Sequence, residues 1–156
     1  SEDVKRAQLQ LLSAQRSYSA FLNIVEEPEQ NLFPTSQREV LNTLVRFSNQ
    51  NDNNKLVITT HSPYLLNYLT LAVKAHSLLE RSTKSDDVVR KIHQIVPIIS
   101  VLNGDDLVVY EMEEVEGTIS LLEDYNGMPS DDNKLNERLG ETNELFAQLL
   151  EIQQQL

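Results

Sequence analysis

The spacing of apolar and polar residues predicts an alternation of helices and strands in the first 60 residues of the chain. Apolar residues recur at helical spacing over 4–18, which predicts an amphipathic helix. The short apolar runs at 21–25 and 55–60 contain β-branched residues and are bounded by polar ones. Such runs favour buried strands over helices. The pattern therefore predicts two strands, with an amphipathic helix between them.

The helix between the two strands has a predicted start and end. Thr35 or Ser36 can cap its first turn through a side-chain oxygen, and the polar cluster at 49–54 ends it. A strand, a helix and a strand at this spacing are typical of a right-handed parallel crossover unit. Neither strand alternates between apolar and polar residues, which favours a parallel sheet covered on both faces.

The rest of the chain predicts more helices and one antiparallel hairpin. The predicted elements are a helix after Pro63 to about Arg81, a short helix capped by Asp86 or Asp87, an extended region from Pro97, a hairpin of 107–112 and 118–122 joined through Gly117, and a helix over 131–153 broken near Gly140. The predicted fold class is therefore α/β, with a partly parallel sheet flanked by helices and an antiparallel hairpin.

Composition narrows the function classes. The chain has 156 residues, enough for one domain, and its 24 acidic and 13 basic residues give a net charge of −11. This charge argues against direct nucleic-acid binding by this chain and against attachment to an anionic membrane. The absence of cysteine excludes disulfides and thiolate metal sites. No targeting or membrane-spanning segment is recognisable, so we expect a cytoplasmic protein, and the abrupt helical start suggests a piece of something longer.

Residues with possible chemistry lie where each predicted strand ends. Glu26 and Glu27 follow the first strand, and His61 follows the second. The carboxyl ends of adjacent parallel strands share one crevice, so these side chains are expected to converge. Neighbouring strand residues point in opposite directions, so one carboxylate can approach a hydrated Mg²⁺ while the other faces a water. This division of roles between the two carboxylates suits phosphoryl transfer to water. Taken alone, however, the acidic run after the first strand is also typical of a solvated loop, and the run around His61 is also typical of a capping turn.

Both strand-end runs resemble motifs of a known class of ATPase. The run from Phe21 to Pro34 resembles the Walker B strand and D-loop of ABC-type ATPases, and the run from Leu56 to Pro63 resembles their H-loop. The closest resemblance is to AAA-family ATP-binding proteins related to the OLD (overcoming lysogenisation defect) nucleases, and more distantly to RecF and SMC proteins. The tail over 135–150 is also similar. The resemblance implies that residues 1–156 are the C-terminal lobe of a P-loop NTPase domain.

The resemblance implies a role for each strand-end residue. Glu26 would hold Mg²⁺ through water, as a glutamate where the wider ABC class has an aspartate, and Glu27 would be the general base. His61 would sense the γ-phosphate. Gln30 and Asn31 would lie in the D-loop, which in such proteins meets a second subunit across the nucleotide. The implied cofactors are ATP and Mg²⁺, and the implied partner is a second copy in a nucleotide-dependent homodimer.

The motif that should cradle the phosphates is missing from the sequence. None of the four glycines (Gly104, Gly117, Gly127 and Gly140) is followed by lysine, so there is no Walker A loop. The Ser-Gly signature before the first strand is also absent. We therefore expect ATP binding and hydrolysis only with a cradle from a missing N-terminal segment, linked by resemblance to DNA processing or phage defence. The alternative is an acidic, non-catalytic module that binds a partner protein.

Overall fold

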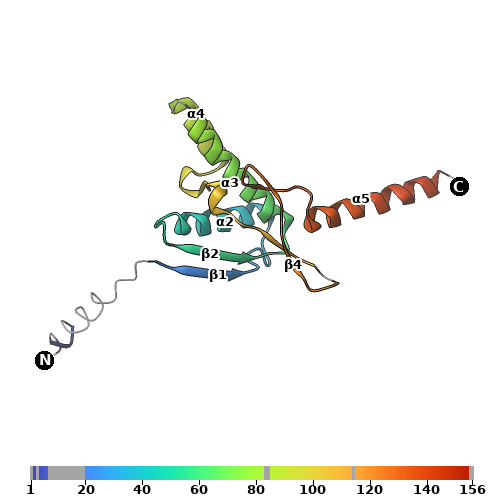
Figure 1. Cartoon of the computed structure of the whole chain (residues 1–156). Coiled ribbons are helices and arrows are strands. Elements are labelled where there is room, and N and C mark those ends of the chain that lie inside the picture. The colour runs from blue at the N-terminus through green and yellow to red at the C-terminus, as the bar shows by residue number, and fades with distance from the viewer. Residues whose placement is uncertain (1, 3, 7–19, 83–84, 114, 155–156) are drawn as a thin grey trace.

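The two strands predicted near the N-terminus pair in parallel. In a computed structural model that describes residues 2, 4–6, 20–82, 85–113 and 115–154, β1 (Leu22–Glu26) lies beside β2 (Lys55–Thr59), as Figure 1 shows. The helix α2 (Pro34–Ser48) connects them. The predicted strand, helix and strand are thus confirmed, while most of the helix predicted over 4–18 lies outside the described residues.

Only one face of this sheet is covered by described elements, so the expected burial on both faces is wrong. The helices α2 and α3 (Pro63–Arg81) lie on the same side of the strands in Figure 1. On the other face, Leu22, Ile24 and Val57 are 63%, 65% and 47% exposed. Burial alternates along β2, whereas in β1 only Val25 is partly buried and the other four residues are exposed, because no described element packs against the second face.

The core lies between the helices and the covered face of the sheet. Two groups of buried side chains form it: Leu41, Val45 and Leu65, packed against Ile58, and Ala72, Ala75, Ile92 and Val96. Leu102 packs against both groups and joins them. Burying each large aliphatic side chain contributes about 1.5–3 kcal/mol. This core fixes α2 and α3 relative to β2 and thereby the strand end that precedes α3.

The helix α2 begins earlier than the sequence suggested. Its N-cap is Phe33, and no side chain caps it, so the expected cap at Thr35 or Ser36 is wrong. Pro34 occupies the first helical turn, where its missing N–H and fixed φ cost nothing. The proline therefore sets the start of α2.

The short helix α4 (Asp86–Ile95) is present, with Ser85 rather than an aspartate at its N-cap. Asp86 and Asp87 instead occupy its first turn, where their negative charge interacts favourably with the helix dipole. Two 3₁₀ turns, η1 (Ile98–Ser100) and η2 (Gly104–Asp106), interrupt the region that was expected to be extended.

The predicted antiparallel hairpin is confirmed in a shorter form. β3 (Tyr110–Met112) pairs with β4 (Ile119–Leu121), and Gly117 in the connection has a φ of 64°. That left-handed conformation is one that glycine adopts without steric cost.

A second hairpin was not predicted. β5 (Asp124–Tyr125) pairs with β6 (Met128–Pro129) through Asn126 and Gly127, whose φ angles are 53° and 74°. Positive φ at both central residues is the geometry that Asn-Gly favours in tight hairpins. The Asn-Gly pair is therefore the feature of the sequence that indicates this hairpin.

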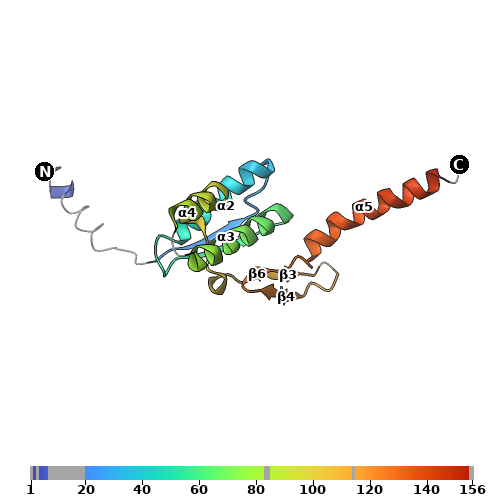
Figure 2. The same ribbon diagram turned by 90° about the horizontal axis from the view of Figure 1, so that it is seen from above.

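The chain ends in one long helix, α5 (Lys134–Gln153), which projects away from the other elements in Figures 1 and 2. It runs unbroken through Gly140, so the predicted break is wrong. A single exposed glycine weakens a helix by about 1 kcal/mol, which is too little to interrupt it. Within the described part of the chain, no helix combines the length and apolar character needed to cross a membrane.

Candidate functional site

The candidate residues lie where β1 and β2 end side by side. The parallel register pairs Glu26 with Thr59, and the backbone N–H of Glu27 donates to the carbonyl oxygen of Thr59 at 2.8 Å. This bond carries the pairing one residue beyond β1. It brings the acidic loop after β1 next to the turn that holds His61, as the strand-end argument anticipated.

The carboxylate of Glu27 is held from two sides. The side-chain amide of Gln30 donates to Oε2 of Glu27 at 2.6 Å, and Nε2 of His61 lies 3.5 Å from Oε1. The backbone of Glu27 has a φ of 43°, a left-handed conformation that costs a non-glycine residue about 1–3 kcal/mol. The surrounding loop stabilises it, since the N–H of Gln30 donates to the carbonyl oxygen of Glu27 at 3.1 Å.

The side chains of His61 and Glu27 differ in their exposure. The imidazole of His61 is 83% exposed, whereas the side chain of Glu27 is 35% exposed. An exposed imidazole beside a half-buried carboxylate leaves both groups accessible to a ligand from solvent. The arrangement can therefore combine a hydrogen-bond donor and a proton acceptor at one point on the surface.

The other two sequence-derived candidates stand apart from this contact. Glu26 is exposed and lies on the uncovered face of the sheet, in register with Thr59. Asn31 is exposed, with a φ of 58°. Within the described residues, neither side chain makes a hydrogen bond or ion pair with Glu27 or His61. The structure thus groups Glu27, Gln30 and His61, and leaves Glu26 and Asn31 at the edge of the group.

Sequence reasoning missed a further acid in the same loop. Oε1 of Glu29 accepts a hydrogen bond from Oγ1 of Thr60 at 2.8 Å and another from the N–H of His61 at 2.7 Å. The Pro-Glu pair was visible in the sequence, but its partners lie about thirty residues away, so no local spacing signals the contact.

A second buried connection supports the same two loops. Oγ of Ser62 donates to Oε1 of Gln37 at 2.6 Å, and the amide of Gln37 donates to the carbonyl oxygen of Leu32 at 3.0 Å. Both polar side chains are buried. Buried polar groups that are fully hydrogen-bonded restrict the chain to one arrangement. The loop after β1 and the turn after β2 are therefore fixed relative to each other.

The strand-end carboxylates suit a divalent cation that is bound together with another ligand. Among the described residues, no group of three or more His, Cys, Asp or Glu side chains could hold a metal ion alone. Mg²⁺ commonly uses only one or two protein carboxylates, with waters and substrate phosphates completing its coordination. The exposed carboxylate of Glu26 is compatible with such a limited contribution.

Comparison with known proteins finds that the segment containing this site matches a family model. Residues 5–66 match the family model described as the AAA ATPase domain. The matched segment includes both strands and all five candidate residues. No curated protein matches the chain, and no solved structure does so either. The strand-end site therefore lies within a segment that is similar to the AAA ATPase domain.

Proposed function

We propose that this chain contributes the catalytic strand ends of an ATP-hydrolysing site. One observation carries the proposal: the carboxylate of Glu27 is held between Gln30 and His61 at the carboxyl ends of two adjacent parallel strands. The AAA ATPase domain match over 5–66 supports it. Ligands of open parallel sheets bind at such strand ends.

In the proposed reaction, Glu27 accepts the proton from the water that attacks the terminal phosphorus of ATP, while the bond from that phosphorus to the bridging oxygen breaks and ADP leaves. Its partial exposure admits water, and its contact with Gln30 holds the carboxylate in one orientation. The exposed imidazole of His61 donates a hydrogen bond to a phosphate oxygen from the neighbouring strand end. Catalysis of this kind depends mainly on positioning and on stabilising charge.

Glu26 is proposed as the contact to the divalent cation, through a bound water. The cation supplies charge neutralisation for the phosphates when it is bound. Glu26 has an exposed carboxylate at the end of β1, which suits an indirect contact. Gln30 and Asn31 belong to the loop that would face a second copy of the protein across the nucleotide.

The phosphate cradle is proposed to come from outside these 156 residues, which would make them the C-terminal part of an ABC-type ATPase domain. No glycine of the chain precedes a lysine, so the sequence contains no loop of the type whose N–H groups bind phosphates. The coupling of hydrolysis to DNA processing or phage defence follows from the resemblance alone.

The test is the substitution Glu27→Gln in the natural protein together with its phosphate-binding segment. Glutamine keeps the size and the hydrogen-bonding oxygen but cannot accept the proton. We expect ATP turnover to fall by about 10²–10⁴-fold with ATP affinity unchanged. Glu123→Gln, which removes an exposed acid from the loop between β4 and β5, is the matched control. Unchanged turnover in Glu27→Gln would show that Glu27 is not the base.

A non-catalytic interaction module is the second candidate, and the exposure of α5 favours it. Helix α5 has no buried residue, and its exposed apolar side chains include Leu139, Leu145, Phe146, Leu149 and Ile152. Exposed apolar surface of this kind commonly marks a protein interface. If this is the main function, Glu27→Gln leaves partner binding intact, and the natural protein lacks ATP turnover from the outset.

A further inference from the structure

We infer that Glu29 is a positioning residue, which clamps the turn carrying His61 to the loop carrying Glu27. Its role in hydrolysis rests on the function proposed above. The clamp itself is a structural relationship that can be tested without nucleotide.

One carboxylate oxygen organises three consecutive residues of the turn after β2. Oε1 of Glu29 accepts hydrogen bonds from Oγ1 of Thr60 and from the N–H of His61, at 2.8 Å and 2.7 Å. Oγ1 of Thr60 in turn accepts a bond from the N–H of Ser62 at 3.0 Å. The backbone of the turn is therefore tied to a single atom of the loop after β1.

The charge of Glu29 strengthens this clamp. Hydrogen bonds to an ionised carboxylate are roughly twice as strong as those between neutral groups. The other oxygen, Oε2, is buried and has no hydrogen-bond partner among the described residues. An unpaired buried acceptor is destabilising, so burial alone would not favour a carboxylate at this position. The two bonds at Oε1 offset that cost.

The position of the His61 ring depends on its backbone because little else holds it. The imidazole is 83% exposed, and its contact with Oε1 of Glu27 is 3.5 Å long. Packing cannot fix a ring in solvent, so the place of the ring depends on the backbone of its turn, which the bond from the His61 N–H to Glu29 holds at that residue. Glu29 thereby controls the separation of His61 and Glu27.

The fold does not require Glu29. Neither hydrophobic core group includes it, and the buried bond between Ser62 and Gln37 connects the same two loops independently. Loss of the Glu29 carboxylate should therefore release the His61 turn locally while α2, α3 and the sheet stay folded. A local effect of this kind separates positioning from general stability.

The test compares Glu29→Ala and Glu29→Gln in this chain by amide hydrogen exchange, read residue by residue by NMR. Glu39→Ala on the exposed face of α2 is the matched control. In Glu29→Ala we expect the His61 amide to exchange at least about tenfold faster, with core amides of β2 and α3 unchanged. Glu29→Gln retains an acceptor oxygen and should restore most of the protection. Equal protection of His61 in all variants, or no rescue by glutamine, would overturn the inference.

Turnover in the natural protein then separates this inference from the proposed function. If both proposals hold, Glu29→Ala lowers ATP turnover without changing ATP affinity, and Glu29→Gln recovers most of it. If Glu27→Gln leaves turnover unchanged while Glu29→Ala still releases the His61 amide, the clamp exists but the proposed chemistry is wrong. If Glu29→Ala releases the amide and turnover stays at the wild-type rate, Glu29 does not position the reaction.

Discussion

Nε2 of His61 lies 3.5 Å from Oε1 of Glu27, so a side chain from one strand end meets a side chain from the other. Removing the imidazole takes away both this contact and the proposed donor to phosphate. We expect His61→Ala to lower ATP turnover in the natural protein by about 10²-fold, the effect of losing one preorganised donor. Steady-state kinetics would measure it, with His76→Ala in α3 as the control histidine. Equal turnover in the two variants would contradict a role for His61.

Of the glycines, Gly104 and Gly127 have the closest backbone approach, although they lie far apart in the sequence. A Cβ on Gly127 would lie 2.4 Å from Cα of Gly104, and Gly127 has a φ of 74°. We expect Gly127→Ala to destabilise the chain by about 1–3 kcal/mol, because backbone atoms must move apart. Denaturant unfolding would measure this. Gly117→Ala is the control, since Gly117 has a φ of 64° and nothing within 4 Å of its added Cβ.

The meeting of Glu27 and His61 could be predicted because it depends only on parallel pairing. Once two neighbouring strands run the same way, the residues that follow them share an edge. The uncovered face of the sheet could not be predicted in this way. Hydrophobic pattern shows which residues favour burial, as at Leu22 and Ile24, but not whether another element covers them.

The clamp by Glu29 illustrates a second limit of sequence interpretation. Its carboxylate reaches Thr60 and His61 from a loop about thirty residues away, and the contact depends on how tightly the loop after β1 turns. That turn relies on the left-handed backbone at Glu27 and Asn31. Such conformations are uncommon for residues other than glycine, and no short-range sequence pattern predicts them.

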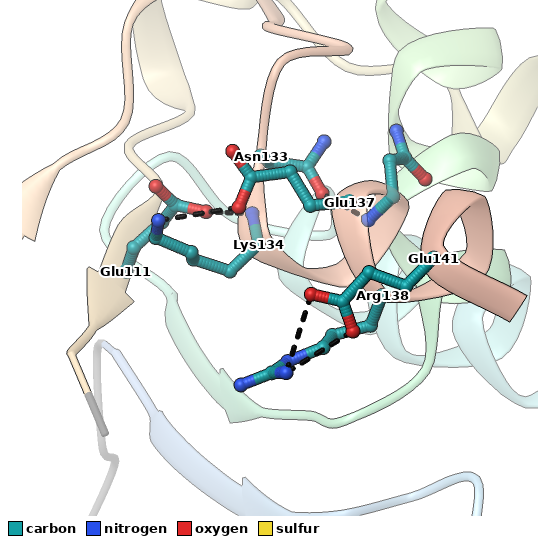
Figure 3. Close-up of polar contacts among 7 residues, drawn as sticks. Glu111, Asn133, Lys134, Glu137, Arg138 and Glu141 are labelled. Atoms are coloured by element: carbon teal, nitrogen blue, oxygen red, sulfur yellow. Dashed lines mark hydrogen bonds and ion pairs between the residues drawn. The ribbon is translucent and has the colours of Figure 1, made fainter. Parts of the chain in front are cut away.

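The start of α5 is held by a buried asparagine, shown in Figure 3. Asn133 is 3% exposed, its Oδ1 accepts from the N–H of Asn136 at 3.0 Å, and its Nδ2 donates to the carbonyl oxygen of Ser130 at 2.8 Å. Asn133→Ala removes the cap and the second bond, so we expect a loss of about 1–2 kcal/mol. Denaturant unfolding and amide exchange in the first turn of α5 would measure it.

The matched variant for this cap is Asn133→Asp. Aspartate keeps the capping oxygen but lacks the amide donor to Ser130, so its loss should lie between zero and that of alanine. A loss in Asn133→Asp as large as in Asn133→Ala would assign the effect to the Ser130 bond and not to the cap.

Lys134, in the first turn of α5, should titrate above its usual range. Its Nζ lies 3.2 Å from Oε2 of Glu137, and this hydrogen bond, followed by the charges of Glu137, Glu113 and Glu111, raises the pKa of Lys134 above its ordinary value of 10.5 (Figure 3). The raised pKa contributes stability below pH 10.5, which is lost as pH rises through the folded value. The group is exposed, so the contribution is small.

An NMR titration of the Lys134 Cε resonance would measure this shift. Glu137→Gln removes the largest cause and should bring the pKa of Lys134 back toward its ordinary value. The ion pair between Arg138 and Glu141 in the next turn serves as an internal reference, because Glu137→Gln leaves it in place. If the pKa of Lys134 is the same in Glu137→Gln as in the unsubstituted protein, Glu137 does not cause the shift.

Gly140 weakens α5 without breaking it, and this gives the sharpest test of that helix. It occupies an interior helical position, and a Cβ added there would meet no atom within 4 Å. Alanine restricts the unfolded chain and favours the helix, so we expect Gly140→Ala to stabilise α5 by about 0.5–1 kcal/mol. Helical circular dichroism and amide exchange within α5 would detect the gain.

The control is Ala147→Gly, at another exposed position of α5, which should destabilise the helix by a similar amount. If Gly140→Ala instead destabilises the protein while Ala147→Gly behaves as expected, position 140 needs a conformation or a close contact that only glycine permits. A straight, solvent-surrounded α5 would then be wrong.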